Sequence, residues 1–180
     1  MKKAADGLLP EIRLDTESAR VHYVTNAAAL IRVGKWLDEL REMGVYDNTR
    51  IIIASDHGRD IGQFPQLITS MGGKDVDVML FCSLLLVKDF GSTEYSVDEG
   101  LMTLADVPEL LLRGQVENPV NPFTGKAIEK MDKDGFEAHI LGSHNWSISI
   151  NNGKRFEAGD WYSVHDDARD VANWRFLYEK

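Results

Sequence analysis

RIIIASDHG, residues 50–58, joins a run of β-branched side chains to a polar turn. Three isoleucines and an alanine that stop at Ser55, Asp56, His57 and Gly58 are typical of a buried strand with an abrupt end. Open α/β sheets form their sites beyond the carboxyl ends of such strands. A carboxylate and a neutral imidazole are suitable ligands for a divalent ion such as zinc or manganese. We therefore expect any chemistry to centre on Asp56 and His57.

A long amphipathic helix is predicted before this strand, over residues 16–44. Apolar residues recur there every three to four positions, and Gly44 suits the position just after a helix. A polar turn at residues 46–49 leads into the strand. The helix, turn and strand make half of a βαβ unit, and the expected fold is therefore α/β, with a small, mostly parallel sheet flanked by helices.

Beyond His57, residues 59–77 indicate a surface loop with some helix. A second buried strand is expected within residues 76–87, strongest at its LLLV end, and a short helix over residues 103–113. Residues 1–115 are thus assigned to the α/β part.

An antiparallel appendage of the same domain is expected over residues 116–180. Aromatic and polar residues alternate in 139–150 and 155–164 around Asn151-Asn152-Gly153, which is a strong hairpin signal. The last fifteen residues fit either a helix or a strand, since Trp174, Phe176 and Tyr178 alternate.

Composition excludes several classes of function. A chain of 180 residues with net charge −9 and pI about 5.0 lacks the clustered basic residues of a nucleic-acid-binding protein. The single cysteine, Cys82, excludes an internal disulfide and a thiolate metal cluster, and its apolar neighbours favour an inert thiol. No apolar run approaches the roughly 20 residues needed to span a bilayer, so a soluble chain is expected. Residues 1–15 lack the apolar segment of a signal peptide.

The residues alone do not decide whether Asp56 and His57 form a functional site. Asp56 and His57 fit an ordinary strand-end turn as well as a metal site, because a divalent ion takes about four to six ligands and this segment supplies two. Lys88, at the end of the second strand, is a candidate for binding an anionic substrate or a solvated lysine. The other histidines are weaker candidates: His22 on the helix, His139 and His144 in the hairpin, and His165 before two aspartates.

These segments resemble the sulfatase-like branch of the alkaline phosphatase superfamily. The resemblance covers about residues 20–130. It is carried by Tyr23 and residues 26–40 of the helix, by the turn (44–49), by RIIIASDHG, by LLLVKDF (84–90), by MTLADVP (102–108) and by NPFTGK (121–126). The last of these is similar to bacterial, membrane-anchored members, which implies an extracytoplasmic or membrane-anchored parent protein.

The resemblance implies that Asp56 and His57 ligate a divalent metal ion. The ion is calcium in sulfatases, and manganese, magnesium or zinc in related transferases and phosphatases. In that family a threonine, serine or formylglycine nucleophile at the metal attacks a sulfate or phosphate ester. The substrate implied here is accordingly an anionic ester of one of these two kinds.

The chain departs from the family pattern before Asp56. It has no Cys/Ser-x-Pro-x-Arg nucleophile motif, and too few residues precede Asp56 to hold the family's earlier strands. We therefore expect residues 1–115 to be the carboxyl-terminal half of a sulfatase-like domain, a partial catalytic domain that lacks the nucleophile. Such a half-site should bind metal weakly and turn over nothing.

Two further expectations follow from a truncated domain. The sheet would keep an unpaired edge and apolar surface, which predicts self-association through the face that the missing half would cover. The rival functions are a cell-envelope phosphoglycerol or phosphoethanolamine transferase, and a degenerate binding or assembly module without catalysis.

Overall fold

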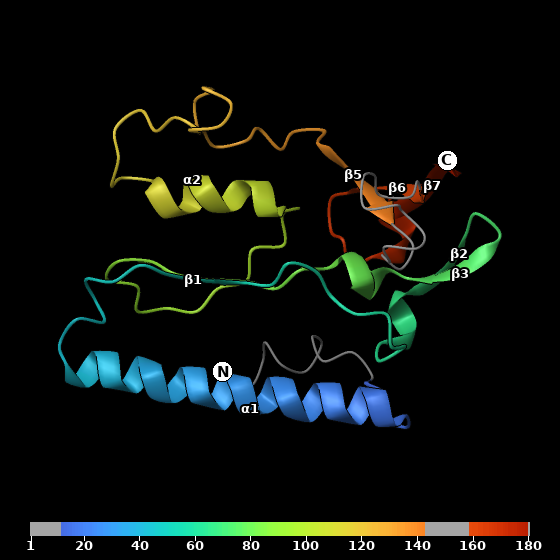
Figure 1. Cartoon of the computed structure of the whole chain (residues 1–180), viewed down its shortest axis with the longest axis horizontal. Helices are drawn as coiled ribbons and strands as arrows, with labels where there is room; N and C mark the ends of the chain where they lie inside the picture. The colour runs from blue at the N-terminus through green and yellow to red at the C-terminus, as the bar shows by residue number, and fades with distance from the viewer. Residues whose placement is uncertain (1–11, 143–158, 180) are drawn as a thin grey trace.

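The structure is a computed structural model that describes residues 12–142 and 159–179. These residues form a mixed α/β arrangement of two α-helices and small antiparallel sheets (Figure 1). The helices are α1 (Glu17–Glu42) and α2 (Val107–Leu112). The strands are β1 (Ile51–Ala54), β2 (Ile68–Met71), β3 (Lys74–Asp77), β4 (Leu85–Lys88), β5 (Glu137–Gly142), β6 (Asp160–His165) and β7 (Trp174–Glu179). No helix among the described residues is both long and apolar enough to cross a membrane.

Helix α1 begins and ends where the sequence predicts. Thr16 caps it by accepting a hydrogen bond from the Ala19 amide at 3.1 Å, and Gly44 follows it with a φ of 71°. The helix buries only Ala19 and Leu40. Its amino-terminal end is held by Gln63, a buried side chain whose amide donates to the Ala19 carbonyl oxygen at 2.9 Å. Much of α1 therefore remains at the surface.

The predicted strand at residues 51–54 is confirmed as β1, but its partner runs antiparallel. Ile51 lies opposite Lys88 and Ala54 lies opposite Leu85. Every strand pair among the described residues is antiparallel, so the predicted mostly parallel sheet is wrong. A parallel pair needs a crossover, usually a helix. Residues 55–84 contain 3₁₀ turns and a hairpin but no α-helix, and the chain returns in the opposite direction.

The loop predicted at residues 59–77 contains a hairpin instead. Strands β2 and β3 pair with Met71 opposite Lys74, leaving a two-residue turn of Gly72 and Gly73. Their φ angles of 60° and 79° match the primed turns that favour two-residue hairpins. The Gly-Gly pair was the sequence signal for this element. The strand expected over residues 76–87 is likewise divided, since a 3₁₀ turn at Val78–Phe81 separates β3 from β4.

The helix predicted at residues 103–113 is confirmed with a two-part form. A 3₁₀ turn at Leu104–Asp106 leads directly into α2, and Thr103 and Asp106 form a capping box. Pro108 occupies the first turn of α2, and Gly114 follows the helix with a φ of 70°.

The carboxyl-terminal part is a three-stranded antiparallel sheet in the order β5-β6-β7. The antiparallel pairing of the two predicted hairpin arms is confirmed for their described parts, with Ile140 opposite Tyr162. The proposed Asn151–Gly153 turn lies outside the described residues. The last fifteen residues, for which the sequence allowed either a helix or a strand, contain strand β7, with Trp174 opposite Val164.

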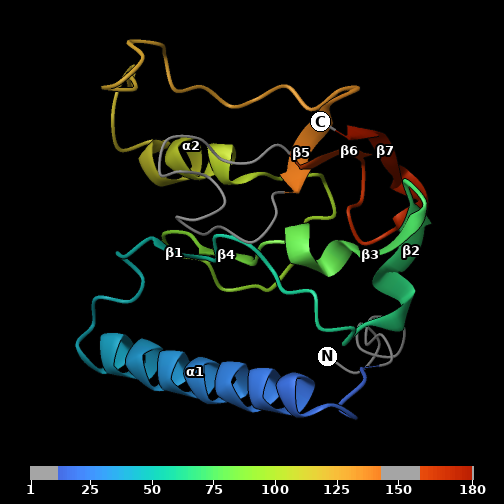
Figure 2. The ribbon, with the colours of Figure 1, turned by 45° about the vertical axis from the view of Figure 1, so that its right-hand side comes forward.

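The core joins this sheet to the β2–β3 hairpin, and the two lie side by side in Figure 2. Its buried members come from both sides of residue 116: Met71, Val76, Val78, Ala138, Tyr162, Val164 and Trp174. Strand β4 lies outside this cluster, and Leu86 and Val87 are 41% and 45% exposed. The prediction that the second strand is buried is therefore wrong. The division of the chain at residue 116 stays a prediction.

Candidate functional site

The segment that carries Asp56 and His57 leaves the carboxyl end of β1 and runs beside residues 80–84. The Ser55 amide donates to the Leu84 carbonyl oxygen at 3.0 Å, and the Ser83 hydroxyl donates to the Asp56 carbonyl oxygen at 3.2 Å. The Gly58 amide donates to the Leu80 carbonyl oxygen at 2.9 Å. These bonds hold the backbone of the pair at both ends.

Glycine is required at position 58 by backbone packing. A Cβ atom there would lie 1.8 Å from the Met79 carbonyl oxygen and 2.8 Å from that of Cys82. No side chain fits such a contact, so any other residue would displace the segment from residues 79–82. Gly58 thereby sets the place of His57, its neighbour.

The Asp56 and His57 side chains converge at the surface. The His57 amide donates to Asp56 Oδ1 at 2.9 Å, which is the turn contact expected of an Asp at a strand end. With the ring proton on Nδ1, that nitrogen donates to the Gly58 carbonyl oxygen at 2.7 Å. The Nε2 atom then presents its lone pair 3.6 Å from Asp56 Oδ2. The turn and the metal-ligand interpretations are therefore compatible, because the turn uses Asp56 Oδ1 and a metal ion would use Oδ2.

The separation between these two atoms suits a shared metal ion. Two ligands about 2.1 Å from a tetrahedral ion lie about 3.4 Å apart. The measured Nε2–Oδ2 distance is 3.6 Å, and both side chains are well exposed, at 65% for His57 and 87% for Asp56. Water or further ligands have access to the same ion. Within residues 12–142 and 159–179, no group of three or more His, Cys, Asp or Glu side chains is arranged to hold a metal.

The remaining histidines do not join this pair. His165 Nδ1 lies 2.8 Å from Asp166 Oδ2 at the end of β6, which is a hydrogen-bond distance and too short for two ligands of one ion. His139 Nε2 is 4.0 Å from Glu137 Oε2, and His22 Nδ1 contacts Gln63. His144 lies outside the described residues.

Lys88 stabilises the turn before β1. Its half-buried ammonium group donates to the carbonyl oxygens of Tyr46 and Thr49, and it lies 4.2 Å from the centre of the Tyr46 ring. It extends from the end of β4 that pairs with Ile51, whereas Asp56 and His57 follow the opposite end of β1. The assignment of Lys88 to substrate binding stays a prediction.

Arg50 is a structural residue that the sequence did not single out. Its Nη1 donates to the carbonyl oxygens of Leu110, Leu111 and Arg113 at 2.7–3.1 Å, and its Nε donates to Asp89 at 2.9 Å. The guanidinium group thus binds the carboxyl-terminal end of α2, where helix carbonyl groups lack partners. The sequence shows an arginine immediately before an apolar strand, but nothing in it indicates that this arginine binds the end of α2.

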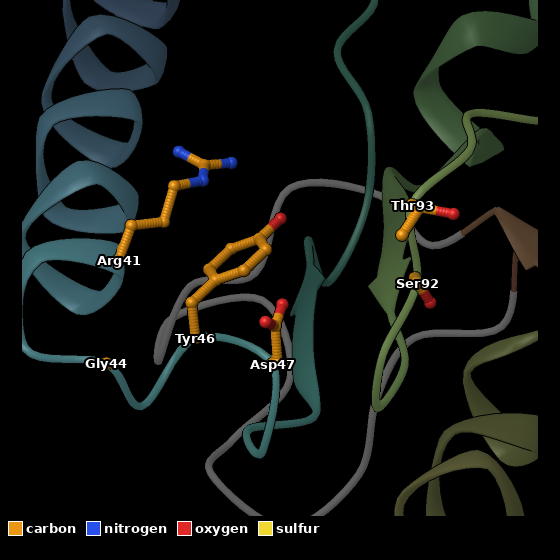
Figure 3. Close-up of a pocket in the computed structure, with 6 residues that line it drawn as sticks. All are labelled: Arg41, Gly44, Tyr46, Asp47, Ser92 and Thr93. Carbon is orange, nitrogen blue, oxygen red and sulfur yellow. The ribbon is translucent and has the colours of Figure 1, made fainter.

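A surface pocket of about 460 Å³ lies at the end of β1 away from Asp56 and His57 (Figure 3). It is lined by Arg41, Gly44, Tyr46, Asp47, Ser92 and Thr93. The Arg41 guanidinium stacks 4.2 Å from the Tyr46 ring centre and also pairs with Asp38 at 2.7 Å. Arg41 is already paired with Asp38, and Asp47 adds a carboxylate to the pocket wall. The pocket therefore has no dominant charge that would select a ligand.

Comparisons with protein-family models, with curated proteins and with the solved structures give no match to this chain. The candidate site therefore stands on the Asp56–His57 geometry and on the resemblance of its sequence segments.

Proposed function

We propose that the chain is part of a sulfatase-like, metal-dependent hydrolase acting on sulfate or phosphate esters, and that Asp56 and His57 supply two ligands to its divalent ion. The observation that carries the proposal is the 3.6 Å approach of His57 Nε2 to Asp56 Oδ2 at the carboxyl end of β1. The nucleophile lies outside this chain, whose sequence has no matching motif.

The metal would neutralise charge on the ester oxygens and on the nucleophile as the ester bond breaks. Asp56 contributes a negative charge to the ion through Oδ2, while Oδ1 keeps the turn in place. His57 contributes a neutral nitrogen whose orientation is set by the bond from Nδ1 to the Gly58 carbonyl oxygen. The described residues supply only these two ligands in one place, which supports weak binding of the ion by this chain alone.

The test is a titration with Zn²⁺ followed by NMR of the histidine rings. Wild-type protein should show fast-exchange shifts of the His57 ring, with a dissociation constant in the high micromolar to millimolar range. Asp56→Ala should weaken that response at least tenfold, since the chelate loses one of its two ligands. Titrations with Mn²⁺ and Ca²⁺ compare the candidate ions by calorimetry.

Asp166→Ala is the matched control, because it also removes an exposed carboxylate next to a histidine. It should leave the His57 response unchanged. Equal zinc responses in wild-type and Asp56→Ala protein would contradict the metal site and favour the degenerate binding or assembly module. Robust ester hydrolysis by the purified chain, lost in Asp56→Ala, would contradict the assignment of the nucleophile to another part of the protein.

The alternative activity is transfer of a phosphoglycerol or phosphoethanolamine group in the cell envelope. It rests on the same metal pair and differs in the acceptor that receives the group. The reading frame upstream of Met1 distinguishes the possibilities, since a nucleophile encoded there would identify the class of chemistry.

A further inference from the structure

Helix α1 carries a second apolar stripe, which faces away from its buried side. Val21, Val24, Ala28 and Ile31 are exposed and follow a spacing of three, four and three residues. The three larger side chains are 57–63% exposed. This spacing places them on one side of a helix, opposite to the side that carries the buried Ala19 and Leu40.

Such a stripe is suited to packing against a second helix. Apolar residues at alternating three- and four-residue spacing are the pattern through which two helices pack along their length. Figures 1 and 2 both show α1 at the edge of the molecule, with the β1–β4 pair on one side of it only. The stripe is therefore accessible along about three helical turns.

The stripe is complementary to itself when two copies of α1 run antiparallel. A two-fold axis level with Asn26 brings Val21 level with the partner's Ile31, and Val24 level with the partner's Ala28. Each pair is equidistant in sequence from Asn26. Ala28, with its small side chain, lets the two backbones approach closely at the central layers.

The charges at the ends of the stripe are complementary in the same arrangement. Glu17 and Lys35 are both exposed, and they are also equidistant from Asn26. Glu17 of one copy therefore lies level with the partner's Lys35, at both ends of the interface. Neither side chain has an ion-pair partner within the part of the chain that the structure describes. A parallel arrangement would instead place like charges together.

We propose that the protein forms an antiparallel homodimer through the Val21–Ile31 stripe of α1. The interface is isologous, as a two-fold dimer requires. It is also small, with three aliphatic side chains and one alanine from each copy, so the dimer should be weak, with a dissociation constant in the micromolar range. The proposal does not depend on the metal site. It also differs from self-association through the truncated sheet face, which the sequence predicted.

Sedimentation velocity over a wide concentration range tests the dimer. Wild-type protein should shift from monomer to dimer, and Val24→Glu should weaken association at least tenfold, because it buries a carboxylate at a central layer. Val97→Glu is the matched control, since Val97 is also exposed, at 44%, and lies far from the stripe in sequence. It should leave association unchanged, and helical circular dichroism should be the same for all three proteins.

Leu86→Glu distinguishes the stripe from the sheet face. Leu86 is 41% exposed on β4. A dimer that survives Val24→Glu and is lost in Leu86→Glu would overturn the proposal in favour of the sheet. A protein that remains monomeric at all concentrations would also overturn it.

A charge exchange tests the antiparallel direction. Glu17→Lys and Lys35→Glu should each weaken association severalfold, because each creates like-charge pairs at both ends of the interface. The double variant should restore wild-type association. Failure of the double variant to restore it, with the helical signal intact, would overturn the antiparallel register.

Disulfide trapping supplies an independent readout of the same register. A mixture of Val24→Cys and Ala28→Cys proteins should give a cross-linked heterodimer, whereas each variant alone should cross-link far more slowly. The native Cys82 should not interfere, because burial, together with the Asp77 and Asp167 carboxylates, raises the pKa of its thiol to about 11. Faster cross-linking of Val24→Cys alone would indicate a parallel dimer and overturn the proposal.

Discussion

The Asp106 carboxylate connects Thr103, at the start of the 3₁₀ turn before α2, with the distant Lys133. Its buried carboxylate accepts hydrogen bonds from the Thr103 amide at 2.7 Å and from the Thr103 hydroxyl at 3.1 Å, and it pairs with Lys133 at 2.8 Å. Burial by itself raises the pKa of Asp106. The bonds from Lys133 and Thr103 outweigh it, and the pKa of the carboxyl lies below its usual value.

Asp106→Asn should lower the free energy of unfolding at pH 7 by about 1–3 kcal/mol, because it leaves the Lys133 charge without its partner. A lowered pKa in the folded state means that the carboxylate contributes its full stability above the unfolded pKa, near 4. That contribution is lost as the pH falls through the lower folded value. Urea unfolding at a series of pH values should therefore show the difference from wild type shrinking below about pH 4.

Asp38→Asn is the control for this prediction, because the Asp38–Arg41 pair is exposed and should contribute less than about 1 kcal/mol. A loss in Asp106→Asn no larger than in Asp38→Asn would contradict a stabilising contribution from the Asp106–Lys133 pair.

At the scale of elements, the β2–β3 hairpin depends on its two glycines for different reasons. Both have positive φ angles, which an L side chain adopts only with strain. A Cβ atom at Gly73 would meet nothing within 4 Å, whereas one at Gly72 would lie 2.8 Å from Phe176 Cδ2. The turn thus also decides how closely the hairpin approaches β7.

Gly73→Ala should destabilise the protein by about 1–2 kcal/mol through backbone strain alone. Gly72→Ala should cost more, since the Phe176 ring must also move. Gly34→Ala provides the opposite control, because Gly34 is helical and has open space at its Cβ position. It should stabilise α1 by about 0.5–1 kcal/mol. Thermal and urea unfolding measure all three, and equal losses at positions 72 and 73 would contradict the contact with Phe176.

At the scale of the whole molecule, the core lies away from the candidate site. Tyr162 and Val164 on β6 are 3% and 1% exposed, and β6 is paired on both sides. The β1–β4 pair that positions Asp56 and His57 has two strands and no member in the buried cluster. An isolated two-stranded sheet is only marginally stable. The site is therefore supported by a weaker part of the structure.

Native-state hydrogen exchange should reveal this difference. The paired amides of β6 should exchange at least tenfold more slowly than those of β1 and β4, because opening β6 requires disruption of the core. Exchange measured by NMR at several low urea concentrations gives the opening free energy of each strand. Similar protection in β1 and β6 would contradict a peripheral β1–β4 pair.

Local elements were predictable from the sequence because their signals are local. Thr16 and Gly44 bound α1, Asp106 and Pro108 mark the start of α2, and the isoleucines of 51–53 predict β1. The Gly72-Gly73 turn carried an equally local signal, but the lack of strict alternation around it favoured a loop. The position of Asp56 and His57 directly after a strand was predictable for the same reason, since the apolar run ends at Ala54.

Only the tertiary structure decided which strands pair, in which direction, and what becomes buried. The antiparallel pairing of β1 and β4 follows from the path of residues 55–84. The buried core includes residues of the aromatic sheet β5–β7 and none of the aliphatic strands β1 and β4. The RIIIASDHG segment by itself determined a strand and a polar turn, because hydrogen-bonding and branching preferences act over a few residues. Its neighbours, its exposure and the 3.6 Å between Nε2 and Oδ2 depend on packing against residues distant in sequence, which no local pattern contains.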